Sequence, residues 1–322
     1  MGRKIAITGA AGYIGQMLLE RLAGKPELEK LTALDLRPPN PLPEKTEFIP
    51  CDIRDPRLVE HLAGADIVVH LAFIVAPIHD LQATYDINLR GTRNLLTAVE
   101  KTRPDKLVIA SSVAAYGLQP RSVELIDENT PLRGDSSSYY NHSKRLVEEH
   151  LDIFEKRNPD IILTRLRPSI LLGPRNHNFA HEIGKLPVAL EVREGLFLPV
   201  VHEEDVIEAF ELAVERDAPG PFIISLTEPV GFEDFDTGKT GPTITLSINT
   251  LLRLSRICYP LRLTKFSPDW IISGKTRWRL DISRAREILG WKPKHDLKTT
   301  IAQMMENIER NKWHRRLWSR LF

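Results

Sequence analysis

The sequence predicts an α/β fold in which a doubly wound parallel sheet is joined to a smaller, mostly C-terminal subdomain. Three observations predict it. Short aliphatic and β-branched runs alternate with amphipathic stretches through the first half, a glycine-rich turn follows the first run, and the alternation stops near residue 170. Parallel strands need crossover connections, which helices supply on both faces of a sheet. We expect the sheet domain over residues 1–172, with further sheet elements around 196–226, and the subdomain over 173–322.

Strands are expected wherever a short aliphatic run is bounded by turn-forming or charged residues. The candidates are KIAIT (4–8), LTALD (31–35), EFIP (47–50), DIVVHLA (66–72), KLVIASS (106–112) and IILTRLR (161–167). The amphipathic stretches between them, such as IGQMLLERLAG, PRLVEHLAG and NLRGTRNLLTAVEKT, predict helices. In such a sheet, ligands bind outside the carboxyl ends of the strands.

The second half is richer in proline and glycine, and GFEDFDTGKTGP is typical of a loop. The stretch SINTLLRLSRICYPLRL predicts a helix as far as Pro260. Asp281 or Ser283 could cap a further short helix that ends at Gly290. The last residues, ERNKWHRRLWSRLF, are basic with interleaved apolar residues. We expect them to form the end of a final helix, with membrane-surface attachment as the alternative.

Length and composition fit one large domain with a smaller appendage. The chain has 322 residues, a hydrophobic fraction of 42%, a charged fraction of 27% and a formal net charge of +1. No overall charge therefore recruits nucleic acid. Cys51 and Cys258 cannot form a disulfide framework, and no C-x-x-C suggests a metal site. No signal-peptide pattern and no apolar stretch of about 18 residues occurs, so we expect a cytoplasmic protein without a membrane span.

The segment TGAAGYIG follows the first strand and opens the first helix, which is typical of a Rossmann-type dinucleotide site. Gly9, Gly12 and Gly15 permit the tight turn, the close approach of a pyrophosphate and close helix packing. The helix N-terminus presents unpaired N–H groups to phosphates. Asp35 lies 20 residues beyond Gly15, where a carboxylate can bind ribose hydroxyls and repel a 2′-phosphate. We therefore expect NAD, and NADP less readily, with Arg37 as the residue that could accept the phosphate.

The segment SYYNHSK contains two tyrosines ahead of one lysine. If it opens a helix, Tyr140 and Lys144 are four residues apart and share a face, whereas Tyr139 and Lys144 diverge. An ammonium beside a phenol favours the phenolate, so the spacing predicts a lowered pKa for Tyr140. The alternative is a surface tyrosine next to a solvated lysine.

Together with CDIRD, NLRGTRNLL, SSVAAYG and LRPSILLGPR, these segments resemble the extended short-chain dehydrogenase/reductase family, also called the NAD-dependent epimerase/dehydratase family. The resemblance is dense over residues 5–175, thin over 176–275, and returns in DISRAREILGWKP. It implies that Ser112, Tyr140 and Lys144 are catalytic. Tyr140 would move the hydroxyl proton, Ser112 would bind the same oxygen, and Lys144 would hold the phenolate and the nicotinamide ribose.

The resemblance also implies the residues that contact the cofactor. CDIRD supplies an adenine-binding carboxylate, and His70 begins an H-x-A segment whose backbone lies along the cofactor. The expected contacts are Gly9, Ala11, Gly12, Tyr13, Ile14, Gly15, Asp35, Arg37, Asp52, Ile53, Leu71, Ala72, Asn88, Tyr140, Lys144, Arg167 and Pro168. No metal is expected. The subdomain is expected to bind the substrate, and the family resemblance implies a homodimer.

Some positions depart from the family pattern. Similar dehydratases carry an Asp-Glu pair where this chain has Val113 and Ala114, which cannot move protons, so dehydration is disfavoured. Nucleotide-sugar epimerases offer an asparagine and an arginine to the diphosphate where this chain has Ile170 and Leu198. The cations that could substitute are Arg175, Arg193, Lys275, Arg277 and Arg279. His202 and Asp205 fit a family segment in which their role is mainly structural.

An apolar insert, FIVAPIHDLQ (73–82), follows the cofactor-lining strand. Phe73, Ile74 and Val75 could form a more apolar substrate pocket than a sugar requires, or they could pack beneath a loop. The sequence therefore favours a sugar or nucleotide-sugar epimerase with NAD retained and recycled. The first alternative is a net dehydrogenase or reductase of a non-nucleotide, more hydrophobic alcohol or ketone. The second is a non-catalytic NAD-binding regulator.

Overall fold

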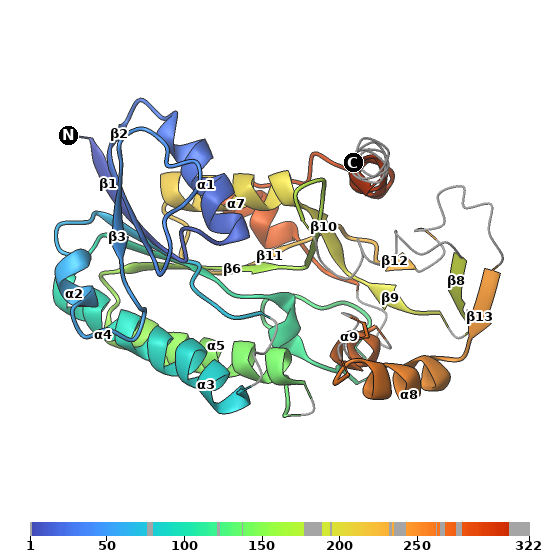
Figure 1. Ribbon diagram of the computed structural model, residues 1–322. Coiled ribbons are helices and arrows are strands. Elements are labelled where there is room, and N and C mark those ends of the chain that lie inside the picture. Colours follow the sequence, from blue (N-terminus) through green and yellow to red (C-terminus); the bar gives the residue numbers. More distant parts are fainter. Residues whose placement is uncertain are drawn as a thin grey trace, which may run out of the picture.

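Figure 1 shows the protein as a computed structural model in which a twisted sheet is covered by helices on both faces. The structure describes residues 2–75, 80–120, 123–136, 138–176, 189–193, 195–231, 234, 243–261, 263–264, 268–274 and 279–308. The segments GFEDFDTGKTGP and ERNKWHRRLWSRLF lie largely or wholly outside these residues.

The main sheet has seven strands in the order β11-β6-β5-β4-β1-β2-β3, and all neighbours are parallel. The strands are β1 (Arg3–Thr8), β2 (Leu28–Asp35), β3 (Thr46–Pro50), β4 (Ile67–His70), β5 (Lys106–Ala110), β6 (Ile162–Pro168) and β11 (Gly220–Ile224). The six strands expected in the first half are confirmed, and β11 comes from the region around 196–226. The strand order reverses between β1 and β4, which is where such sheets bind ligands.

Helices cover both faces of this sheet (Figure 1). On one face lie α1 (Tyr13–Ala23), α7 (Glu203–Glu215) and the π-helical turn η4 (Ala285–Leu289). On the other lie α2 (Leu58–His61), α4 (Gly91–Thr102) and α5 (Tyr139–Arg157). The short helix α3 (Leu81–Tyr85) runs through the π-helical turn η1 (Asp86–Arg90) into α4, and the 3-10 turn η2 (Val113–Tyr116) follows β5. The predicted helix end at Gly290 is confirmed by a left-handed residue, with φ of +70°.

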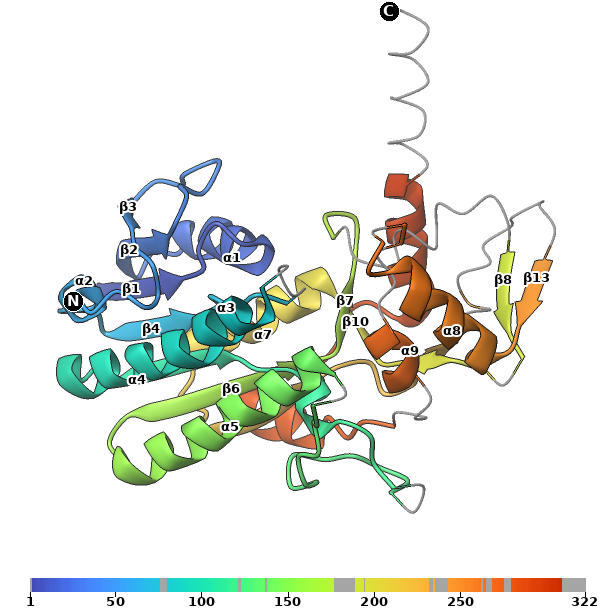
Figure 2. The same ribbon diagram turned by 60° about the horizontal axis from the view of Figure 1, so that its bottom comes forward.

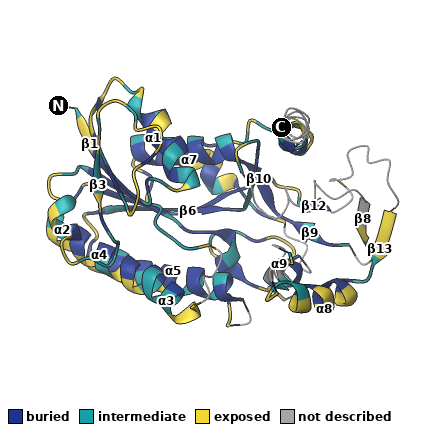
Figure 3. Ribbon diagram, in the orientation of Figure 1, coloured by how far each residue is buried: buried dark blue, intermediate teal, exposed yellow. Residues whose placement is uncertain are grey.

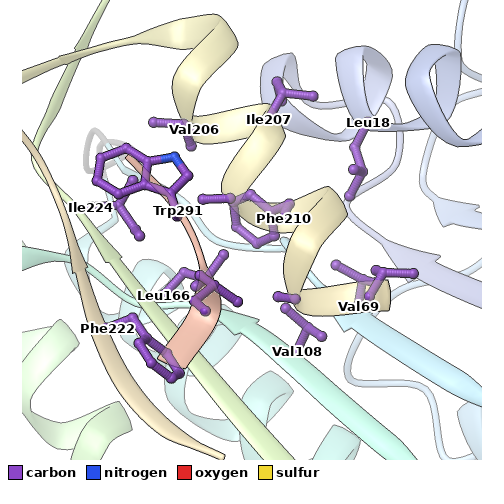
Figure 4. Close-up of a cluster of buried hydrophobic side chains, with 14 of the residues drawn as sticks. Leu18, Val69, Val108, Leu166, Val206, Ile207, Phe210, Phe222, Ile224 and Trp291 are labelled. Carbon is purple, nitrogen blue, oxygen red and sulfur yellow. The ribbon is translucent and has the colours of Figure 1, made fainter. Parts of the chain in front are cut away.

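Successive strand residues pack into two different cores. Ile7, Val69 and Val108 contact the α1–α7 side, whereas their neighbours Val68 and Leu107 contact the α4–α5 side. Figure 4 shows the first core, in which side chains from sheet, helices and a C-terminal segment meet: Leu18, Val69, Val108, Leu166, Val206, Ile207, Phe210, Phe222, Ile224 and Trp291. Because both faces are covered, the central strand β4 is buried at every residue rather than at alternate ones.

The C-terminal segment is attached to helix α7 by polar contacts as well as packing. The indole N–H of Trp291, which is fully buried, donates to the backbone oxygen of Asp205 at 2.7 Å. The Asp205 carboxylate accepts from the backbone N–H of His295 at 3.1 Å. His202 accepts from the Glu204 N–H and so caps α7. These contacts agree with the structural role that the sequence assigned to His202 and Asp205.

A smaller unit lies beside the sheet domain and contains short strand pairs and helices (Figure 2). Its strands are β7 (Ile170–Leu172) with β10 (Val200–His202), β9 (Phe197–Leu198) with β12 (Val230–Gly231), and β8 (Ala189–Val192) with β13 (Thr243–Leu246). Its helices α8 (Ile248–Cys258) and α9 (Pro268–Ser273) share an apolar cluster with helical residues 297–308.

Burial follows these layers, because β6 and the inward sides of α5 and α7 are buried while α8 exposes its outer side (Figure 3). Within the described residues, no helix has the length and apolar character needed to cross a membrane.

Candidate active site

The glycine turn after β1 lies against the chain that leaves β4. Gly9 has a φ of +71°, and a Cβ there would lie 2.5 Å from the backbone nitrogen of Ala72. A Cβ at Gly15 would lie 2.3 Å from the carbonyl oxygen of Gly9. Both positions therefore require glycine for the turn itself. The turn leads directly into α1. The first N–H groups of this helix have no carbonyl partner within the helix, and no side chain caps them at Gly12.

Asp35 ends β2 beside this turn. Its carboxylate accepts from the Ala11 N–H at 3.0 Å and from the Leu36 N–H at 2.7 Å. Arg37 is exposed on the following loop. A backbone cradle without side chains, a helix N-terminus and a carboxylate at the end of the second strand fit the diphosphate and ribose of a dinucleotide.

Ser112, Tyr140 and Lys144 come together at the carboxyl ends of β5 and β6. Ser112 follows β5 and donates to the Pro168 carbonyl oxygen at 3.3 Å, and its side chain is also hydrogen-bonded to that of Tyr140. Tyr140 lies in the first turn of α5, which Ser138 caps. Lys144 lies one turn later, and its ammonium donates to the Ala110 carbonyl oxygen at 2.8 Å. The structure therefore gathers the three residues predicted to be catalytic.

Burial dominates the electrostatics of this group. It lowers the pKa of Lys144 to about 7, against the opposing charge of Glu148. It also raises the pKa of Tyr140, although the hydrogen bond with Ser112 lowers it. The predicted lowering of the Tyr140 pKa is therefore wrong. Helix spacing identified the two neighbours, but it could not show how far distant segments remove each group from solvent.

Phe73 covers this pair. The Lys144 ammonium lies 3.7 Å from the centroid of the Phe73 ring. The Phe73 ring also meets the Tyr140 ring edge to face, with centroids 5.9 Å apart. Of the apolar residues that the sequence singled out after β4, this one therefore touches the candidate reaction centre directly.

Tyr139 points to a different partner. Its hydroxyl accepts from the Asn88 amide and donates to the Ile74 carbonyl oxygen at 3.3 Å. Asn88 also donates to that carbonyl at 3.0 Å and accepts from the Ile74 N–H at 2.8 Å. Tyr139 and Asn88 therefore fasten the segment after β4. Asn88, which was expected among the cofactor contacts, therefore holds the backbone of Ile74 in place.

A buried ion network lies behind Lys144. Arg167 donates to both carboxylate oxygens of Glu148, at 2.8 and 2.9 Å, and to the Tyr116 hydroxyl at 2.8 Å. Arg165 and Ser111 also donate to Glu148, at 3.0 and 2.5 Å. Although burial raises the pKa of Glu148, Arg167 and Arg165 lower it to about 2. The guanidinium of Arg167, expected near the cofactor, is thus occupied inside this network.

Sequence reasoning did not identify Glu148, although one feature of the sequence pointed to it. Glu148 lies four residues after Lys144, on the same face of α5.

His70 on β4 is also buried, and its ring nitrogen Nδ1 is hydrogen-bonded to the Thr8 hydroxyl at 2.7 Å. Burial, with the charge of Lys144, lowers the pKa of His70 to about 3, so the ring is neutral.

Asp52, the residue expected to contact the adenine, is held by Arg54, whose guanidinium donates to its carboxylate at 2.6 and 3.0 Å. Arg54 also lowers the pKa of Asp52, against the effect of burial. Ile53 is buried against α4, and a Cβ at Gly91 would lie 2.5 Å from its Cγ2 atom.

A contact between distant segments was also missed. The carboxylate of Glu203, only 1% exposed, accepts from the Tyr13 hydroxyl and from the Arg175 N–H at 3.0 and 3.2 Å. It therefore ties the glycine turn to the loop after β7. Burial, with Glu203, strongly raises the pKa of Tyr13.

The two positions at which the family pattern has an asparagine and an arginine are part of an apolar core. Leu198 is 1% exposed within the core of the C-terminal unit, and Ile170 packs against that core. The Arg175 guanidinium pairs with Glu20 at 2.8 Å. Arg193 and Arg279 are exposed on the surface. The remaining two substitutes, Lys275 and Arg277, lie outside the described residues.

Comparison with known proteins places these features in a family. The family model described as "NAD dependent epimerase/dehydratase family" matches residues 5–224. An N-acetyl-α-D-glucosaminyl-diphospho-ditrans,octacis-undecaprenol 4-epimerase of Escherichia coli O157:H7 is 28% identical over 275 residues, which are 81% of this chain and 77% of that protein. A putative UDP-glucose 4-epimerase of Methanocaldococcus jannaschii is 28% identical over 320 residues, which are 95% of this chain and 99% of that protein.

Solved structures show the same fold. A UDP-glucuronic acid 4-epimerase from Bacillus cereus in complex with NAD superposes with a TM-score of 0.74 at 21% identity, covering 95% of this chain and 99% of that one. The family model spans more than half of the chain. The protein is therefore an enzyme of the NAD-dependent epimerase/dehydratase family.

Proposed function

We propose that the protein transfers hydride between NAD and the secondary alcohol carbon of a sugar or nucleotide sugar, in a 4-epimerase type of reaction. The observation that carries the proposal is the convergence of Ser112, Tyr140 and Lys144 at the strand ends beside the glycine turn. The names of two similar proteins, a lipid-diphosphate-linked N-acetylglucosamine 4-epimerase and a putative UDP-glucose 4-epimerase, support the substrate class.

The chemistry follows from the residue types. Tyr140, as phenolate, takes the proton of the substrate hydroxyl while the C–H bond on the same carbon breaks, and it returns that proton when the carbonyl is reduced. Ser112 hydrogen-bonds to the same oxygen as charge develops there. Lys144, when protonated, favours the phenolate. Bound NAD would supply a hydride acceptor that returns the same hydride, so no net oxidation would result.

Residues of the turn and of β2 would hold the cofactor. The backbone around Gly9, Gly12 and Gly15 and the first N–H groups of α1 would bind the diphosphate. Asp35 would bind the adenosine ribose and repel a 2′-phosphate, which supports NAD over NADP. Lys144 would bind the nicotinamide ribose. Arg167 would support Pro168 through the buried network rather than touch the cofactor with its side chain.

One alternative is favoured by specific contacts. An aromatic ring covers the candidate reaction centre, and the two positions where related epimerases bind diphosphate hold apolar residues, Ile170 and Leu198. Both features suit a net dehydrogenase of a more hydrophobic secondary alcohol. Dehydration is not supported, because Val113 and Ala114 follow Ser112 and carry no group that moves protons.

The two functions differ in what happens to the cofactor. Purified protein should be denatured, and the released nucleotide should be identified by chromatography. A separate native sample of the protein should be mixed with UDP-hexoses, diphospho-undecaprenol-linked N-acetylglucosamine and hydrophobic secondary alcohols. An epimerase should release NAD on denaturation and convert a sugar with no net change in absorbance at about 340 nm, where reduced nicotinamide absorbs. A net change with an added alcohol would establish the alternative, and failure to bind NAD would contradict both.

A further inference from the structure

The outer side of α8 and the turn after it expose aliphatic side chains close together. Leu254 is 46% exposed, Ile257 62%, Leu261 63% and Leu263 73%. Single exposed side chains of this kind are normal on a protein surface, but a group of them indicates an interaction site. We call these four residues the α8 cluster. Figures 2 and 3 show α8 at the periphery of the C-terminal unit, with its exposed side turned outward.

Helix geometry explains why these side chains lie together. The opposite face of α8 packs in the core of the C-terminal unit through Ile248, Leu251 and Leu252. Leu254 and Ile257 are three residues apart and therefore share the outer face. After the helix the chain turns back, and the Leu263 N–H donates to the Cys258 carbonyl oxygen at 3.0 Å. This bond closes the turn that carries Leu261 onto the end of α8.

Basic side chains accompany the α8 cluster, and acidic ones do not. Arg253 and Arg256 are exposed on the same outer side of the helix. No described carboxylate pairs with either of them. From residue 237 to residue 267 the sequence contains no Asp or Glu. Glu191 on β8 lies at the other end of this stretch, where it accepts from the Thr245 hydroxyl at 2.7 Å. The surface is therefore both apolar and cationic, and its complement must be apolar and anionic.

We propose that the α8 cluster, with Arg253 and Arg256, attaches the protein peripherally to a lipid bilayer that contains anionic phospholipids. A helix that carries arginine beside exposed aliphatic residues lies in the interface between headgroups and acyl chains. The aliphatic side chains enter the acyl boundary, while the guanidinium groups bind lipid phosphates. No spanning helix is needed for this attachment.

A bilayer fits this surface better than an acidic groove on another protein. A protein groove has a fixed shape and binds side chains whose positions are fixed as well. In the α8 cluster, three of the four side chains are 62–73% exposed and so contact few neighbours that would fix them. Fluid lipid accepts such side chains without a matching shape. The attachment does not depend on the proposed function, because no residue of the candidate active site takes part in it.

The test is co-sedimentation of the full-length protein with lipid vesicles. One set contains phosphatidylcholine alone, and the other contains phosphatidylcholine with an equal part of phosphatidylglycerol. Wild type should bind the anionic vesicles at least about tenfold more tightly, and salt should remove this preference. Arg253→Gln with Arg256→Gln should weaken that binding about 30-fold, which corresponds to about 1 kcal/mol for each arginine. Arg93→Gln with Arg286→Gln, which changes the net charge equally at exposed positions on α4 and η4, should have a much smaller effect.

A second pair of variants tests the apolar part of the surface. Ile257→Gln with Leu263→Gln should weaken binding to the anionic vesicles by about tenfold or more, because two exposed aliphatic groups no longer enter the lipid. The matched control is Ile153→Gln with Ile288→Gln, on α5 and η4, where the side chains are 53% and 45% exposed. This control should bind as wild type does. Circular dichroism checks that each variant is folded.

A label at Cys258 reports which part of the protein touches the vesicle. The chain has two cysteines, and Cys258 is partly exposed at the end of α8. Burial raises the pKa of the other, Cys51, to about 11, so a thiol reagent near neutral pH should modify Cys258. The emission of a nitrobenzoxadiazole group on Cys258 should move to shorter wavelength when anionic vesicles are added. An unchanged emission of the bound protein would contradict the proposal.

The other outcomes are equally distinct. Wild type that does not bind anionic vesicles overturns the proposal. Binding that both α8 variants leave unchanged also overturns it, because another part of the chain, such as the basic C-terminal residues, would then make the contact. If vesicles are not bound and Ile257→Gln with Leu263→Gln dissociates an oligomer on size-exclusion chromatography, the α8 cluster is an interface between copies of the chain. None of these measurements involves NAD, so they succeed or fail independently of the proposed function.

Discussion

Charged side chains lie in different places in two regions of the molecule, the candidate reaction centre of the sheet domain and the C-terminal unit. Behind the candidate reaction centre, Arg165, Arg167 and Glu148 are buried together and hydrogen-bonded. In the C-terminal unit the core is apolar and described cations such as Arg193 lie on the surface. The difference is that the three candidate catalytic residues lie against a buried network of charged side chains, whereas the core of the C-terminal unit contains apolar side chains at Ile170 and Leu198.

The largest expected effect comes from breaking the buried network. Arg167→Met leaves the buried carboxylate of Glu148 with one fewer charged partner, so the free energy of unfolding should fall by about 3–5 kcal/mol. Urea unfolding followed by circular dichroism measures it. Lys30→Met breaks a pair with Glu47 whose side chains are 47% and 53% exposed, and it should cost far less. Equal losses in the two variants would remove the contrast between the regions.

A second effect concerns pH. Lys144 titrates near pH 7 when folded and near its ordinary value of 10.5 when unfolded, so between these values the unfolded chain binds more protons. This group therefore makes stability rise with pH over that window, by about 1.4 kcal/mol per pH unit, and its full cost is present below pH 7. Lys144→Met should flatten that part of the curve relative to wild type. Parallel stability curves between pH 7 and 10 would show that the ammonium is not desolvated.

A third effect, of about tenfold, concerns cofactor choice. Asp35→Ala removes the carboxylate that we expect to repel a 2′-phosphate, and one lost charge contact corresponds to about 1.4 kcal/mol. The ratio of the dissociation constants for NADP and NAD, from isothermal titration calorimetry, should fall accordingly. Asp52→Ala is the matched change at the adenine end and should alter both constants together. An unchanged ratio in Asp35→Ala would count against its contact with the ribose.

The smallest effect is expected on the substrate side. The Arg175 guanidinium is exposed and already paired with Glu20, so Arg175→Gln should change the KM for any UDP-sugar that the protein turns over by less than about twofold. Steady-state kinetics with the best substrate from the panel measures it. A loss of tenfold or more would mean that Arg175 leaves Glu20 to bind the diphosphate, and the substrate side would then resemble other epimerases after all.

Sequence reasoning succeeded where a short local pattern fixes geometry. The glycine spacing, Asp35 at the end of β2, and the four-residue spacing of Tyr140 and Lys144 each depend on one turn, strand or helix. It failed where distant segments meet. The ring of Phe73 over Lys144 and the Glu203–Tyr13 contact join residues far apart in the chain.

The two tyrosines show the same limit within one helix turn. Their spacing from Lys144 separated Tyr140 from Tyr139, as the structure bears out in their partners. Spacing could not reveal that burial raises the pKa of Tyr140, because this burial depends on residues from distant segments, such as Phe73 after β4 and Ser112 after β5. The direction of a pKa shift is a property of the assembled site.

The most direct measurement is turnover of Tyr140→Phe beside Tyr139→Phe, with the substrate identified from the panel and the bound NAD content determined for both. We expect Tyr140→Phe to lower kcat by about 10²–10⁴-fold with NAD still bound, because only the proton-transferring oxygen is lost. Tyr139→Phe should keep kcat within about tenfold of wild type, because its hydroxyl donates to the backbone carbonyl of Ile74. Turnover that survives in Tyr140→Phe and collapses in Tyr139→Phe would show that Tyr140 is not the proton-transferring residue.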